Sequence, residues 1–269
     1  MLGKPRWLGA IAALVYCFLY LPVVVLIAYS FDASRLAVTW SGFTLNWYRI
    51  LFHDQALAGA LANSLVVACV AVSFSAVMGT MAALGIARFH FRGAELYRGV
   101  LFLPIVIPEI AMAVSALTLF LALGLKLSLA TIIVGHIVFC MAYVALVVTG
   151  RLEGLDPHLE EAAQDLGAPP PAVFLKVTLP LIAPGILAGC LLAFVLSLDD
   201  FVITQFTAGV GDTTLPLRIY SLVKFGVSPE INALSTLMIA ATVGLTLVAE
   251  LIRRGQESGA RLSGQPHGS

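Results

Sequence analysis

The sequence predicts an all-α protein that crosses a membrane six times. Of its 269 residues, 60% are hydrophobic and 11% are charged, whereas a soluble domain is about 45–50% apolar and about 25% charged. The mean hydropathy is +0.99. The 23 glycines and 13 prolines also suit membrane helices, in which both residues are commoner than in soluble ones. A lipid bilayer can cover this apolar surface, and helices satisfy their own backbone hydrogen bonds there.

Six segments are long enough to span a bilayer, which takes about 20 mostly apolar residues. They lie at about 8–29, 58–86, 99–123, 128–149, 182–206 and 231–252. The first has a longer apolar run than the core of a secretory signal, about 7–15 residues, so we expect it to be a span. Residues 1–254 are therefore expected to form one transmembrane domain, and the polar tail 255–269 is expected to be disordered.

The charges predict the orientation of the chain. Basic and acidic side chains number 15 each, so the net charge is zero and nucleic acid is not an expected partner. If both termini are cytoplasmic, ten of the 15 basic residues lie on the inner side and five on the outer side, as the positive-inside rule requires. All four cysteines fall in apolar stretches without metal-ligand spacing, so we expect packing residues and no metal site.

The inner segment 150–181 carries the signals of a short helix. Asp156 suits an N-cap, Pro157 suits the first helical position, and Gly167 suits a left-handed C-terminal position. An apolar stripe runs along it at Leu155, Leu159, Ala162 and Leu166. A second short helix is expected at about 172–177, after three consecutive prolines. By pattern alone, the first helix could equally lie on the membrane surface.

This segment resembles the signature loop of ABC importer permeases. The matching residues are Glu161-Ala162-Ala163, then Gly167 after three residues, then Val177-Thr178-Leu179-Pro180 after nine more. The family usually has Ile where Val177 stands. The resemblance implies a coupling helix that sits in a groove of a cytoplasmic ATPase dimer.

The resemblance also implies which residues contact the ATPase. They would be Leu159, Glu161, Ala162, Ala163, Leu166 and Gly167. The small residues would allow close backbone approach, the leucines would enter the groove, and the glutamate would accept hydrogen bonds from the partner. The chain has no Walker-type Gly-rich Lys-Ser/Thr loop, so we expect no catalytic residues and no bound cofactor, with ATP and Mg²⁺ on the ATPase.

Three acidic residues fall within the expected spans: Glu109 in the third, and Asp199 and Asp200 in the fifth. Ionisable groups at such depth cost about 2.5–3.5 kcal/mol, so they are expected to line a cavity or to meet a partner. The alternative is a structural role, in which they pair with Ser or Thr across helices. Because adjacent helical residues point about 100° apart, we expect one aspartate to face the pathway and the other to brace a neighbouring element.

Aromatic residues near these acids suit an organic cation, since an aromatic face attracts an ammonium group. The candidates are Phe201, Phe206 and Tyr220. Tyr220 belongs to a stretch in which Leu215, Ile219, Leu222 and Val223 have the spacing of an amphipathic helix. His136 is expected to be a hydrogen-bonded packing group.

The C-terminal third resembles the second permease of spermidine and putrescine importers. The matching residues are Ser197-Leu198-Asp199-Asp200-Phe201, Thr214-Leu215-Pro216, Ile219-Tyr220-Ser221 and 227–234. The resemblance implies a type I ABC importer permease in a bacterial inner membrane that forms half of a polyamine pathway. Its partners would be a homologous second permease, the ATPase dimer and a periplasmic or extracellular solute-binding protein, which segment 207–230 would contact.

Three alternatives remain at this point. The importer could move another solute, such as iron, thiamine or an aminophosphonate. The chain could be an ion-coupled secondary carrier, although no convincing inverted repeat is visible. A membrane-embedded enzyme would need an intramembrane constellation of His, Ser or Cys residues, and none is apparent.

Overall fold

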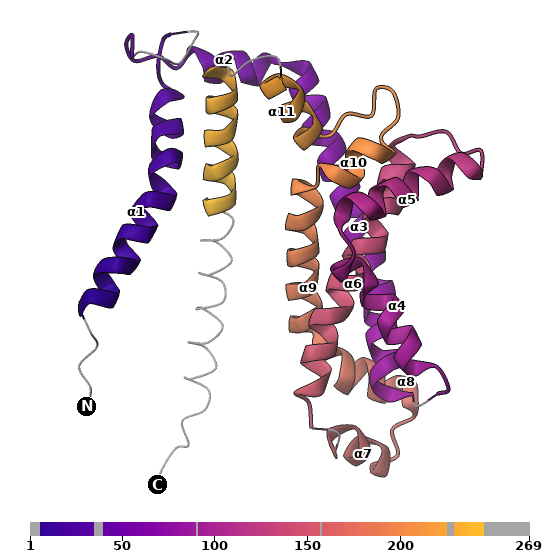
Figure 1. Ribbon diagram of the computed structural model, residues 1–269. Helices are drawn as coiled ribbons and strands as arrows, with labels where there is room; N and C mark the ends of the chain where they lie inside the picture. Colours follow the sequence, from indigo (N-terminus) through magenta and orange to yellow (C-terminus); the bar gives the residue numbers. More distant parts are fainter. Residues whose placement is uncertain (1–5, 35–39, 90, 157, 225–228, 245–269) are drawn as a thin grey trace. The chain divides into compact units, whose positions relative to one another are not determined.

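The computed structural model describes residues 6–34, 40–89, 91–156, 158–224 and 229–244, which are almost entirely helical (Figure 1). An isolated bridge pairs Asp32 with Phe43. The chain forms two compact units: residues 1–54 with 221–269, and residues 55–220.

The first unit contains α1 (Arg6–Tyr29), α2 (Asn46–His53) and a helix over residues 229–244. Asp32 organises the turn between α1 and α2. Its Oδ1 accepts hydrogen bonds from Ser41 N at 2.7 Å and Ser41 Oγ at 3.2 Å, and its carbonyl oxygen accepts one from Trp47 Nε1 at 2.7 Å. The backbone donation from Ser41 holds the pKa of Asp32 below its usual value.

The core of the second unit is built by α3 (Gln55–Arg88), α6 (Leu129–Glu153) and α9 (Leu179–Asp199), which pack side by side (Figure 1). Small residues allow their close contact. A Cβ atom at Gly79 would lie 2.9 Å from the carbonyl oxygen of Met141, and one at Gly189 would lie 3.2 Å from Val144 Cα. Close approach through small residues is the usual way in which membrane helices associate.

The expected third span is not one straight helix. Residues 99–123 divide into α4 (Ala94–Val106) and α5 (Glu109–Ala122), which are bent by 108°. Ile107 at the break is extended, with φ −70° and ψ 137°. Pro108 is the reason, because a proline disfavours the helical conformation in the residue before it.

The expected fifth span, 182–206, differs at both ends. The apolar helix starts at Pro170 and continues through α8 (Pro170–Val173), a π-helical segment η1 (Phe174–Thr178) and α9 to Asp199. Residues 172–177 are helical as expected, but they belong to this long helix and do not form a separate one. The prolines begin the long helix, because proline is favoured at a first helical turn. After extended Asp200, with ψ 122°, the chain enters α10 (Val202–Thr207).

The predicted amphipathic outer helix is confirmed as α11 (Leu215–Lys224). Two hydrogen bonds join the start of this segment to α3: Leu215 N donates to Ser64 Oγ at 2.8 Å, and Asn63 Nδ2 donates to the carbonyl oxygen of Thr213 at 3.0 Å. The last eight residues of the expected sixth span, 245–252, and the tail 255–269 lie outside the described residues.

Four described helices are long and apolar enough to cross a membrane. They are 9–29, 55–88, 129–153 and 170–199, and the bent pair of α4 and α5 would be a fifth span. Along the described chain these spans fall at the first five of the expected positions.

Candidate functional site

Glu109 is the first residue of α5, and its side chain is exposed. The Pro108 break places it at the N-terminus of this helix. Its carboxyl group is close enough to Asp200 and Asp199 to interact electrostatically with both. The structure thus brings together the three acidic residues that the sequence placed in two different spans.

Asp200 is held in place by the protein itself. It is 6% exposed, and its Oδ1 accepts a hydrogen bond from Ile203 N at 3.2 Å. Its Oδ2 accepts bonds from Thr204 N and from Thr204 Oγ1, both at 2.9 Å. The amides of Ile203 and Thr204 belong to the first turn of α10, so Asp200 caps that helix.

The other partner of Asp200 is His136 on α6. His136 Nε2 lies 3.1 Å from Asp200 Oδ2 and 3.1 Å from Thr204 Oγ1, and its Nδ1 lies 2.7 Å from Ser197 Oγ. His136 is buried and hydrogen-bonded, as expected of a packing group. Its pairing with Asp200 was not foreseen, because nothing in the local pattern around His136 indicates which distant segment it meets.

Asp199 is in a different environment from its neighbour. Its side chain is exposed at the last position of α9. Within the described part of the chain, the Asp199 carboxylate makes no hydrogen bond or ion pair, although it lies within Coulombic reach of Glu109. The two aspartates therefore differ in their surroundings, because Asp200 is buried and hydrogen-bonded whereas Asp199 is exposed.

An aromatic pair includes Phe201, which directly follows the two aspartates in the sequence. The rings of Phe201 and Tyr220 have centroids 4.5 Å apart, and Tyr220 is half exposed. Phe206 instead packs against the hydrophobic core, so it is not part of this group. Exposed carboxylates next to aromatic rings can attract an organic cation by charge and by cation–π contact. Among the described residues, no group of three or more His, Cys, Asp or Glu side chains is arranged to hold a metal ion.

The inner segment 150–181 contains the predicted helix, α7 (His158–Asp165). Asp156 Oδ1 accepts a hydrogen bond from His158 N at 3.0 Å, so its capping role is confirmed. Gly167 adopts the left-handed conformation expected of it, with φ +83°, and Ala168 N donates to the carbonyl oxygen of Ala163 at 3.1 Å. Pro157 lies outside the described residues.

The residues expected to contact an ATPase are largely uncovered. Leu166 is 90% exposed. Leu159, Glu161, Ala162 and Gly167 are also exposed, whereas Ala163 is partly buried. Glu161 Oε2 lies 3.0 Å from His158 Nδ1, and this hydrogen bond raises the pKa of His158 above its usual value.

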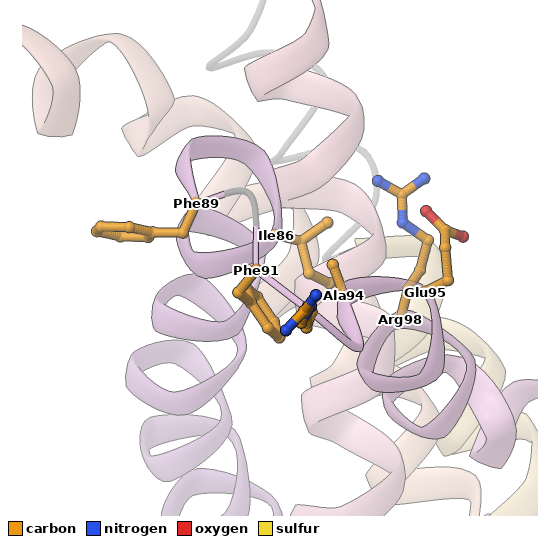
Figure 2. Close-up of a pocket in the computed structure, with 7 residues that line it drawn as sticks. Ile86, Phe89, Phe91, Ala94, Glu95 and Arg98 are labelled. Atoms are coloured by element: carbon orange, nitrogen blue, oxygen red, sulfur yellow. The ribbon is translucent and has the colours of Figure 1, made fainter.

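A cavity of about 500 Å³ lies at the turn between α3 and α4. It is lined by Ile86, Phe89, Phe91, Arg92, Ala94, Glu95 and Arg98 (Figure 2). The cavity contains none of the expected site residues, and two arginines against one glutamate do not suit a cationic ligand. In Figure 2 the Phe89 ring points away from the group formed by Ile86, Phe91 and Ala94.

The chain is similar to a known family of transport proteins. Residues 75–261 match the family described as binding-protein-dependent transport system inner membrane component. The chain belongs to this family. It is thus a membrane transport component with the all-α permease fold that the resemblance implied, and neither the membrane-embedded enzyme nor the ion-coupled carrier fits that family.

Individual relatives agree with the family match. The chain is 40% identical to the spermidine/putrescine transport system permease protein PotC of Haemophilus influenzae, over 91% of this chain and 96% of the relative. It is 44% identical to the putrescine transport system permease protein PotI of Escherichia coli, over 88% of this chain and 87% of the relative.

Solved structures support the fold. A bacterial ABC transporter that imports the polysaccharide alginate aligns with a TM-score of 0.70 at 17% identity, over 91% of this chain and 96% of that chain. At this identity the likeness concerns the fold alone.

Proposed function

We propose that this chain is one of two permease subunits of an ATP-driven importer, and that it forms half of the pathway for a polyamine such as putrescine or spermidine. The observation that carries the proposal is the exposed carboxylate pair, Glu109 and Asp199, beside the aromatic pair Phe201 and Tyr220. The names of the relatives point to the same class of substrate.

The chemistry of a polyamine matches this group of side chains. Two carboxylates can each meet an ammonium group, and the rings can cover the methylene chain or stack on a charge. Glu109 and Asp199 are assigned to the ligand because their carboxylates are exposed. Asp200 is assigned to bracing, because its oxygens already accept bonds from Thr204 and contact His136.

The partners follow from the exposed helix α7. Leu159 and Leu166 would enter a groove of the ATPase subunit, and Glu161 would accept hydrogen bonds from it, so that ATP and Mg²⁺ act on the ATPase dimer. A second, homologous permease would supply the other wall of the pathway. A solute-binding protein would dock on the outer side at segment 207–230. This arrangement requires both termini in the cytoplasm, in agreement with the distribution of basic residues.

The test is uptake of labelled putrescine and spermidine by the complete complex in proteoliposomes, with binding protein outside and ATP inside. We expect ATP-dependent, vanadate-sensitive uptake that requires this subunit. Replacing both ligand carboxylates (Glu109→Gln with Asp199→Asn) should abolish uptake. The control Glu153→Gln, which changes an exposed carboxylate at the end of α6, should leave uptake unchanged. An assembled complex that takes up neither polyamine, but does take up an aminophosphonate or thiamine, would contradict the substrate assignment.

A further inference from the structure

The coupling helix α7 carries a second acid, Glu160, that is held inside the protein. Arg88 Nη2 forms an ion pair with Glu160 Oε1, and Thr178 Oγ1 donates a hydrogen bond of 2.7 Å to the same oxygen. The Glu160 side chain is 17% exposed and that of Arg88 is 35% exposed, while Thr178 is buried. Charge-assisted bonds that are partly shielded from water are stronger and less screened than surface ion pairs.

These three residues come from three separate elements. Arg88 is the last residue of α3, and Thr178 is the last residue of η1, directly before α9. Because α3 and α9 are core helices of this unit, Glu160 connects α7 with two membrane spans. The third core helix is tied in separately: Arg151 Nε near the end of α6 donates to the carbonyl oxygen of Leu181 at 3.1 Å.

The helix is irregular at Thr178. In η1 the amide of Leu179 donates to the carbonyl oxygen of Phe174, a bond between residues five apart. A π-helical turn holds one more residue than an α-helical turn, and such turns occur often at functional sites. Glu160 therefore contacts the long fifth-span helix at its one described departure from α-helical geometry.

We infer that Glu160 is the joint through which movement of α7 reaches α3 and α9, with Arg88 and Thr178 as its anchors. The inference rests on the proposed function, in which an ATPase moves α7. Glu160 is a positioning residue in this role: it contacts neither the substrate nor ATP. The division of labour follows from helix geometry, because Glu160 and Glu161 point about 100° apart. Glu160 faces the spans, and Glu161 faces outwards.

The decisive measurement is the amount of polyamine taken up per ATP hydrolysed by the complete complex. Glu160→Gln keeps an acceptor for Thr178 but removes the charge that pairs with Arg88, and Arg88→Gln removes the other charge. In both variants we expect uptake per ATP to fall about tenfold or more, the effect of losing one charge-assisted bond, while ATP hydrolysis continues.

Matched controls separate this effect from a general loss of charge. Arg92→Gln removes a basic residue from the turn that follows Arg88, and Glu153→Gln removes an exposed carboxylate from the end of α6. Both controls should take up as much polyamine per ATP hydrolysed as the wild type. The variant with both Glu160→Gln and Arg88→Gln should be no worse than either single variant, because the two changes remove the same interaction. Exchange of the two charges, Arg88→Glu with Glu160→Arg, should recover part of the coupling.

A second measurement does not depend on transport. Hydrogen exchange at the amides of residues 158–166 should accelerate in Glu160→Gln and Arg88→Gln, and should be unchanged in the two controls. Suppose that the wild type transports, and that all four single variants have the same uptake per ATP and the same exchange rates. Then Glu160 does not transmit the movement of α7, and the proposed function stands. If the wild type shows no ATP-dependent uptake while exchange responds as expected, the contact is real and the proposed function fails, and the coupling role fails with it.

Discussion

Two pairs of adjacent acidic residues lie near the two ends of the long helix α9, and each pair is divided between the protein and the solvent. At the start, Glu160 bonds to Thr178 and pairs with Arg88, whereas Glu161 is exposed. At the other end, Asp200 is buried and Asp199 is exposed. In both pairs one acid is bonded within the protein and the other is exposed.

The two held acids differ in how deeply they are enclosed. Asp200 is 6% exposed and its partners are buried groups, namely the first amides of α10, Thr204 and His136. Glu160 is more exposed, and its partner Arg88 is partly in contact with solvent. Since an unpaired polar group costs more in a buried site, loss of Asp200 should affect folding, whereas loss of Glu160 should affect mainly movement.

The largest expected effect is that of Asp200→Ala. This change leaves His136, Thr204 and two backbone amides without an acceptor, so we expect the free energy of unfolding to fall by about 3 kcal/mol or more. Thermal unfolding of the purified subunit in detergent measures it. Asp199→Ala is the control and should change stability by less than about 0.5 kcal/mol. An equal loss of unfolding free energy in Asp200→Ala and Asp199→Ala would show that the two aspartates do not differ in their contribution to stability.

Glu161→Lys should have the next largest effect, on coupling. A cation would replace the acceptor that faces the ATPase, and we expect coupled uptake to fall roughly 30-fold, or about 2 kcal/mol. Insertion should be normal and stability little changed, because the side chain is exposed and its hydrogen bond with His158 lies at the surface. Uptake and ATP hydrolysis by the complete complex provide the measurement. Normal coupling would show that Glu161 is not the acid that meets the ATPase.

Asp199→Asn should have a smaller effect, confined to the substrate. The amide keeps the shape of the side chain but cannot neutralise an ammonium group, so we expect the half-saturating putrescine concentration to rise about tenfold, or about 1.4 kcal/mol. The concentration dependence of uptake measures it, with assembly checked by size-exclusion chromatography. An unchanged half-saturation in both Asp199→Asn and Asp200→Asn would assign both aspartates to structure.

The smallest expected effect concerns pH. The hydrogen bond from His158 to Glu161, with the nearby charges of Asp156 and Glu161, raises the pKa of His158 above 6.5. A raised pKa in the folded protein means that the stabilising contact is complete below pH of about 6.5 and is lost as the pH rises through the higher value. An NMR titration of the imidazole measures this pKa. Glu161→Gln should move it back towards 6.5, and an unchanged titration would exclude this contact in solution.

Local patterns predicted helix α7 well. Asp156 and Gly167 mark its two ends, and both act as expected, because capping depends on residues within one turn of each other. The prediction of one straight span at 99–123 is wrong. The apolar run 99–123 suggested one span, yet the effect of Pro108 on Ile107 bends the path by 108°. Proline often occurs inside membrane helices, so its presence alone does not distinguish a kink from a break.

The sequence by itself determined that this chain is a helical membrane protein, that acids lie in or beside its apolar segments, and that a short helix joins the fourth and fifth spans. These features depend on composition, on segment length and on neighbours within a few residues. Only the tertiary structure decided which acid of each pair is free. That choice depends on Arg88, His136 and Thr204, which approach the acids through the packing of distant helices. Adjacent acids have the same chemistry, and their separate roles arise because helix geometry turns one towards those partners and the other away.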